Sequence, residues 1–111
     1  MITRTAVFEG KIKSGQEEAF FAAVRERLAP LWEQFPNATN VRLLRVERSD
    51  ADAPPIAMIQ QIDYPSLAAM EEALASPVRT MARATTEDIL KMFDGRFYHI
   101  VSDGNAIEAL P

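Results

Sequence analysis

The sequence predicts an α+β domain in which four strands form one antiparallel sheet and two helical regions cover one face of it. Three observations support this prediction. The strand and helix patterns follow the order βαββαβ, each helical region carries an apolar stripe interrupted by proline, and the strands place large apolar residues on both sides. The chain has 111 residues, of which 48% are hydrophobic, enough for one core. We therefore expect residues 1–111 to form a single domain, with residues 104–111 as a C-terminal tail.

The first half of the chain begins with one strand pattern and one helix pattern. Residues 3–13 are rich in Thr, Val, Phe and Ile, which favours a strand. Ser14 and Glu17 have the spacing of a capping box and predict a helix start, and apolar residues then recur at threes and fours to about residue 35. Pro30 removes one helical N–H and crowds the preceding turn, so we expect a kink or break near Leu28.

Two further strands follow, and they predict a hairpin with a long loop. Residues 41–48 and 56–63 are dense in β-branched and long apolar residues, and a polar, proline-rich stretch joins them. Ser66 then predicts the cap of a second helical region.

The second helical region is expected to be broken before the last strand. Ser76-Pro77 predicts a restart, because proline suits the first position of a helix. Thr86 is a further predicted cap, and Asp94-Gly95 predicts a turn. The last strand is expected at residues 97–101.

A βαββαβ order closes most simply as a ferredoxin-like, split βαβ fold with both helical regions on one face of the sheet. The other face then lacks a cover, yet the strands carry apolar residues on both sides, as Val41 and Leu43 on one side and Leu44 and Val46 on the other show. An uncovered face would reach the largest apolar patch usual for a monomer, about 300 to 600 Å². We therefore expect a homodimer through the open sheet face. A different partner, or the tail folded over this face, is the alternative.

The composition excludes several classes of partner and site. The net charge of −4 provides no basic excess for nucleic acid or an anionic membrane. The absence of Cys and the presence of one His exclude disulfides, thiolate chemistry and a multi-His metal site within one chain. We expect no metal and no cofactor. No apolar run approaches the roughly 20 residues of a membrane span, and the first residues lack a signal-peptide core, so we expect a cytoplasmic protein with no membrane partner.

His99 is the candidate catalytic residue, because its side chain alone has an unperturbed pKa near neutrality. A regular strand places it on one side with Phe97 and Val101, and Tyr98 on the other. Apolar neighbours desolvate the imidazole and favour the neutral form that accepts a proton. The alternative is a structural histidine, hydrogen-bonded within the sheet or at the dimer interface.

Two aromatic residues are candidate ligand-binding residues. Tyr64 ends a strand and could offer its phenol to a ligand at the mouth of a cavity, or could anchor the strand end. Trp32 lies on the apolar stripe near Pro30, where its ring could floor a pocket for a flat substrate or pack in the core.

Two polar residues complete the candidate ligand-binding set. Arg45 shares a strand face with apolar residues, so its guanidinium needs a partner such as Glu9 or a ligand carboxylate. Gln60 and Gln61 lie on opposite faces of one strand, so one of them is expected to be a buried amide that requires hydrogen bonds. We include Gln60 among the candidate ligand-binding residues.

Residues 64–77, Tyr-Pro-Ser-Leu-Ala-Ala-Met-Glu-Glu-Ala-Leu-Ala-Ser-Pro, resemble a pattern of the EthD-like family in the dimeric α+β barrel superfamily. The rest of the chain resembles that family by element order and length. The resemblance implies a dimeric barrel with a small-molecule pocket between the sheet and its helices. The superfamily includes monooxygenases, muconolactone isomerases and haem-degrading enzymes, but the positions of Trp32 and His99 do not match the haem-degrading pattern.

These observations predict a small-molecule-binding homodimer. One hypothesis is a cofactor-independent enzyme, an isomerase, dehydratase or oxygenase, that acts on a hydrophobic or aromatic metabolite with His99 as the proton-transfer residue. A second is a non-catalytic ligand-binding or stress-associated protein. A third is a structural dimer that fills its cavity with its own Phe and Met side chains. A cavity of roughly 300 Å³ or more within reach of His99 favours the first two.

Overall fold

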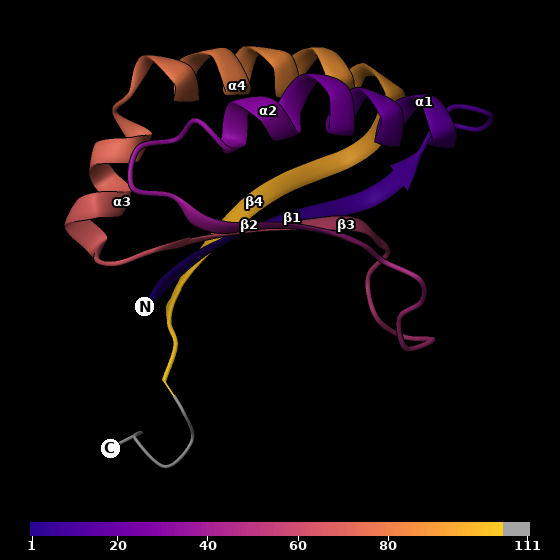
Figure 1. Cartoon of the computed structure of the whole chain (residues 1–111). Coiled ribbons are helices and arrows are strands. Elements are labelled where there is room, and N and C mark those ends of the chain that lie inside the picture. The colour runs from indigo at the N-terminus through magenta and orange to yellow at the C-terminus, as the bar shows by residue number, and fades with distance from the viewer. Residues whose placement is uncertain (106–111) are drawn as a thin grey trace.

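A computed structural model describes residues 1–105 and contains one four-stranded antiparallel sheet in the order β2-β3-β1-β4. The helices all lie on one face of this sheet (Figure 1). This arrangement confirms the ferredoxin-like prediction. The elements are β1 (Ile2–Ile12), α1 (Glu17–Ala23), the π-helix η1 (Val24–Leu28), α2 (Ala29–Trp32), β2 (Thr39–Arg45), β3 (Ile56–Tyr64), α3 (Leu67–Leu74), α4 (Pro77–Ile89), the 3₁₀-helix η2 (Leu90–Met92) and β4 (Phe93–Asp103).

The first helical region starts and breaks for local reasons. The prediction that Ser14 caps this helix was wrong, because α1 begins at Glu17 without a side-chain cap. Instead, the backbone N–H of Gln16 donates to the carbonyl of Lys13 and closes a turn before the helix. The predicted break is confirmed, since α1 continues as the π-helix η1 and α2 follows it. Pro30 cannot donate to the carbonyl one turn earlier, and a wider π turn accommodates such a residue.

In the second helical region, two of the three predicted helix starts are confirmed. The Ser66 hydroxyl accepts a hydrogen bond from the backbone N–H of Ala69 at 3.1 Å, and Pro77 begins α4. The prediction that Thr86 caps a helix was wrong. Its hydroxyl instead donates to the backbone carbonyl of Ala82 at 2.8 Å, inside a continuous α4.

The edge strand β4 starts earlier than the sequence suggests, because Asp94-Gly95 belongs to the strand and forms no turn. Gly95 pairs with Gly10 of β1. A Cβ on Gly10 would lie 2.2 Å from the carbonyl oxygen of Asp94, so two facing glycines permit this close approach. The hairpin is confirmed, although β2 ends at Arg45 rather than at residue 48. Residues 106–111, most of the predicted tail, lie outside the described residues.

The core lies between the sheet and the helices. Rings of Phe8, Phe20 and Phe93 pack against one another with centroids 5.9 to 6.4 Å apart. Met58 pairs with Phe8 across the sheet, and both Met58 and Tyr64 are completely buried in the core. Among residues 1–105, no helix has the length and apolar character needed to cross a membrane.

Candidate functional site

A cavity of about 240 Å³ lies between the helix-facing side of the sheet and the helices. Its walls combine aromatic rings with positively charged and amide side chains. The lining residues are Arg4, Ala6, Phe8, Trp32, Phe35, Gln60, Arg79, Ala82, Arg83, Thr86, Phe97 and His99. The volume is below the roughly 300 Å³ expected for a ligand pocket, so cavity size by itself does not favour ligand binding over a structural dimer.

Three neighbouring strands build the floor of the cavity. Ala6 of β1 pairs with Gln60 of β3 on one side and with His99 of β4 on the other. Residues directly opposite one another share a sheet face, so Gln60, Ala6 and His99 form one row under the helices. The small side chain of Ala6 leaves space between two polar side chains. Alternation along β4 sends Tyr98 to the opposite face, as predicted.

Helix α4 forms one wall through one of its faces. Arg79, Ala82, Arg83 and Thr86 follow the spacing i, i+3, i+4 and i+7, which places them along a single stripe. Ala82 and Thr86 are buried, whereas Arg83 is exposed and marks the rim. Trp32 from the end of α2 contributes to the apolar lining.

His99 lies at the rim, with its outer side exposed and its inner side lining the cavity. The ring of Phe97 meets it edge-on with centroids 5.5 Å apart. Partial burial, followed by the positive charges of Arg4 and Arg79, lowers the pKa of His99 from 6.5 to about 4. The imidazole is therefore neutral at pH 7 and has a lone pair that can accept a proton.

Arg4 and Arg79 bring positive charge to the cavity without an ion-pair partner among residues 1–105. Neither guanidinium forms an ion pair with a carboxylate of residues 1–105, whereas Arg83 pairs with Glu87 at 3.8 Å. Burial and the charge of Arg79 lower the pKa of Arg4, and Tyr64 and Glu71 oppose this effect. The local electrostatics therefore favour an anion.

The structure brings three of the five predicted site residues together and separates the other two from them. His99, Trp32 and Gln60 line one cavity. Tyr64 is buried in the core rather than placed at a cavity mouth, and its hydroxyl has no partner among the described residues. Arg45 is exposed, forms an ion pair with Glu17 and lies over a phenylalanine ring outside this cavity.

Sequence reasoning missed the two cavity arginines, although a signal for each was present. Arg4 shares its strand face with Ile2, Ala6 and Phe8, so its charge falls among residues that belong to the core. Arg79 lies in register with the buried stripe of α4. Glu9, the partner considered for Arg45, instead accepts a hydrogen bond from Arg96 at 3.0 Å.

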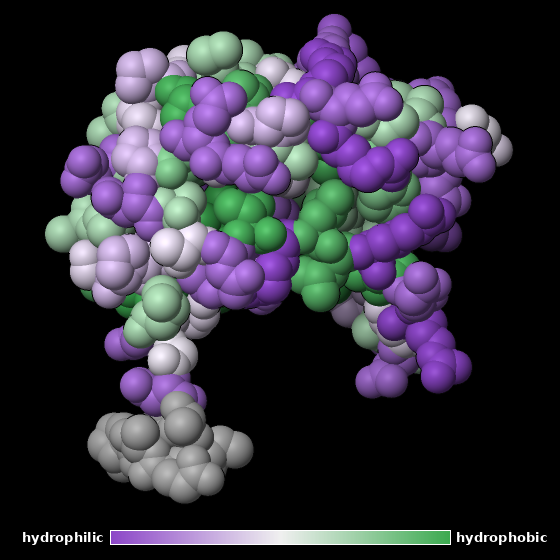
Figure 2. Space-filling view, in the orientation of Figure 1, coloured by the Kyte–Doolittle hydropathy of each residue, from purple (hydrophilic) through white to green (hydrophobic). Residues whose placement is uncertain are grey.

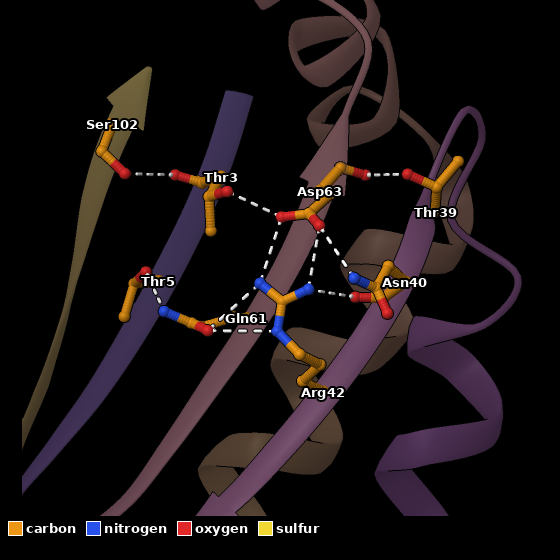
Figure 3. Close-up of polar contacts among 8 residues, drawn as sticks. All are labelled: Thr3, Thr5, Thr39, Asn40, Arg42, Gln61, Asp63 and Ser102. Atoms are coloured by element: carbon orange, nitrogen blue, oxygen red, sulfur yellow. Dashed lines mark hydrogen bonds and ion pairs between the residues drawn. The ribbon is translucent and has the colours of Figure 1, made fainter. Parts of the chain in front are cut away.

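The sheet face away from the helices carries a second polar cluster (Figure 3). Arg42 donates to Asp63 at 2.8 Å and to Gln61, and the hydroxyl of Thr3 also donates to Asp63 at 2.6 Å. The bond from Arg42 is the main reason that the pKa of Asp63 lies well below its ordinary value of 3.8. Each charge in this cluster is matched, unlike the charge in the cavity.

Comparisons with known proteins give the fold independent support. No protein-family model and no curated protein matches the sequence. An EthD family protein from Bacillus halodurans C-125 is 15% identical, with a TM-score of 0.73 over 95% of this chain and 99% of its own. A DABB family protein of ferredoxin-like fold from Mesorhizobium loti is 18% identical, with a TM-score of 0.64 over 95% and 97%. An antibiotic biosynthesis monooxygenase is 17% identical, with a TM-score of 0.64 over 96% of this chain and 100% of its own.

These similarities show the fold alone, because the identities are low. The expected resemblance to EthD-like proteins is confirmed at that level. The chain shares the ferredoxin-like fold with these proteins, and a fold does not specify a substrate.

Proposed function

We propose that this protein binds a small hydrophobic or aromatic molecule in the cavity between sheet and helices and that His99 transfers a proton to and from it. The observation that carries the proposal is the row of Gln60, Ala6 and His99 beneath an aromatic wall. This row places a neutral proton acceptor beside the aromatic rings of the cavity. Fold similarity to enzymes of related architecture supports the proposal without deciding the reaction.

The size of the cavity limits the ligand to about one ring with small substituents. A cavity of about 150 Å³ engineered into another protein binds benzene, and the cavity here has about 240 Å³. The rings of Trp32, Phe35 and Phe97 offer apolar contact to such a molecule. A larger ligand would have to extend past Arg83 into solvent.

Among the reactions considered, isomerisation and dehydration fit His99 best. In an isomerisation, His99 would take a proton from one carbon of the ligand and return it to another carbon of the same molecule. An oxygenase would also need O₂ as a co-reactant. One observation favours a non-catalytic ligand-binding protein instead: a pKa near 4 makes the empty-cavity imidazole a weak base.

The test combines ligand identification with one substitution. We expect native mass spectrometry of the purified protein to show a retained small molecule, and extraction to identify it. His99→Gln is expected to retain this molecule while its conversion, followed by chromatography, stops. Conversion at the native rate would remove the role assigned to His99. Binding without conversion by either protein would support the non-catalytic alternative.

We also propose that a second copy covers the open face of the sheet. No helix covers this face in Figure 1, and Figure 2 shows the molecule hollowed below it, between the end of β4 and the loop between β2 and β3. Leu44 and Ile100 lie on this face and are 43% and 51% exposed. A two-fold pair of sheets would bury both copies of this surface in one closed interface.

The dimer is tested by sedimentation of matched variants. The native protein is expected at twice the 12.4 kDa mass of one chain. Ile100→Lys should produce monomer, because it places an unpaired charge on the sheet face that the dimer would bury. Met81→Lys is the control, since Met81 is 58% exposed but lies on α4. A native protein that sediments as a monomer would refute this proposal.

A further inference from the structure

The cavity contains positive charge that its own walls do not neutralise. Arg4 from β1 and Arg79 from α4 are both half-buried, and the charge of Arg79 contributes to lowering the pKa of Arg4. Among residues 1–105, neither has a carboxylate within ion-pair distance. Elsewhere on the sheet, Arg42, Arg45 and Arg96 each have an acidic partner. Arg4 therefore differs from the other arginines of the described strands, and Arg79 adds a second guanidinium without an ion pair to the same cavity.

The amide of Gln60 is a second, independent indication of a ligand. Gln60 is only 5% exposed and lines the cavity. Its side chain makes no hydrogen bond with any other described residue, although buried amides normally have partners. Gln61, on the opposite face, bonds to both Arg42 and Thr5. A polar ligand group would supply the bond that Gln60 lacks.

We propose that the natural ligand of this cavity is a small aromatic carboxylate, whose carboxylate group is bound by Arg4 and Arg79. The inference rests on the proposed function, because it names the class of molecule held by the same cavity. A guanidinium presents donors that match the two oxygens of a carboxylate. An anion between two guanidiniums removes their mutual repulsion, so charge alone favours this ligand over a neutral one.

The spacing of the floor residues fits a ligand with one charged end. Arg4 lies two residues before Ala6 on the same side of β1, about 7 Å along the strand. A carboxylate at Arg4 therefore leaves the ring above Ala6, between Gln60 and His99. The aromatic wall then covers the ring, and the imidazole lies beside the ligand body rather than at its charged end.

The test compares benzoate with benzamide, which has nearly the same shape and no charge. We expect calorimetry with the purified protein to give at least about tenfold tighter binding of benzoate, the ratio expected when a charge-assisted hydrogen bond replaces a neutral one. Arg4→Gln and Arg79→Gln should each weaken benzoate by a similar factor and leave benzamide unchanged. Circular dichroism checks that both variants fold.

Arg25→Gln is the matched control, because Arg25 is exposed on η1 and its loss changes the net charge equally. It should leave benzoate binding unchanged. Equal binding of benzoate and benzamide would overturn the carboxylate inference while the proposed function stands. Binding of neither probe would overturn both. Benzoate binding that weakens as much in Arg25→Gln as in Arg79→Gln would show a general charge effect and also overturn the inference.

Discussion

At the scale of single residues, the chemistry depends on the groups that surround His99. Arg4 on β1 and Arg79 and Arg83 on α4 face the same cavity, and Glu71 acts on Arg4 from α3. Two of these arginines add to the effect of burial in keeping the imidazole neutral. An anionic ligand reverses part of this effect, so binding and proton uptake are coupled.

The first prediction is the titration of His99 itself. Because the chain has one histidine, its ring signals in an NMR titration are unambiguous. We expect a midpoint near pH 4, compared with 6.5 for an unperturbed imidazole, and a higher midpoint with benzoate bound. A midpoint that stays near 6.5 in the free protein would contradict the described electrostatics.

The lowered pKa of His99 also has a consequence for stability. The unfolded chain binds this proton below about pH 6.5, whereas the folded chain resists binding it until about pH 4. His99 should therefore make its full contribution to the free energy of unfolding above pH 6.5. This contribution should decrease as the pH falls toward 4. Denaturant titrations should show a shallower decrease for His99→Gln. An identical pH dependence in both proteins would exclude this contribution.

The third residue-scale prediction concerns Asp63, the acidic centre of the polar cluster in Figure 3. Its lowered pKa means that it stabilises the fold above about pH 4 and loses this effect as the pH falls further. Asp63→Asn should reduce the free energy of unfolding by about 1.5 to 3 kcal/mol, the range for hydrogen bonds to charged groups. Asp50→Asn, an exposed loop change, should alter it by less than about 0.5 kcal/mol. Equal effects would contradict the role of the cluster.

At the scale of elements, the close pairing of β1 and β4 depends on two facing glycines, Gly10 and Gly95. A Cβ on Gly95 would lie 2.1 Å from the carbonyl oxygen of Glu9, at a backbone φ of +156°. We expect Gly95→Ala to cost more than about 2 kcal/mol in thermal or denaturant unfolding, because strain and a backbone clash combine. Gly104→Ala is the control, since nothing lies within 4 Å of its added Cβ. Comparable stability of the two variants would be inconsistent with this close approach.

The elements also show which parts of the fold are predictable from sequence. Ser66 and Pro77 were predicted correctly because capping depends on residues within one turn. Asp94-Gly95 was misjudged because pairing with β1, more than eighty residues earlier, extends the strand through a typical turn pair. Thr86 was misjudged because its hydroxyl bonds back into its own helix.

In the candidate site, too, features set by the local sequence were predictable and features set by distant contacts were not. Strand alternation predicted that His99 shares a side with Phe97, and the structure places both in the cavity wall. The burial of Tyr64 depends on helices from distant parts of the chain, so strand position alone did not reveal it. The pairing of Arg4 and Arg79 requires β1 and α4 to meet, which no local pattern specifies.

At the scale of the whole molecule, one sheet separates two surfaces with different roles. The helix side encloses a cavity with unneutralised positive charge, and the open side combines apolar residues with a matched ionic cluster. The proposed dimer uses the open side and leaves the cavity on the helix side available to ligand. Ligand binding and dimer formation should therefore be separable by mutation, so Ile100→Lys should weaken the dimer without changing the cavity lining.

The most direct test of the proposed function fills the cavity without altering its polar groups. Ala82 is 4% exposed and faces the cavity from α4, so Ala82→Leu places three more carbon atoms in that space. We predict that calorimetry with whichever probe binds the native protein, benzoate or benzamide, will show at least about tenfold weaker binding, because the bulk excludes the ring. Native affinity in a folded Ala82→Leu protein would contradict the claim that this cavity is the binding site.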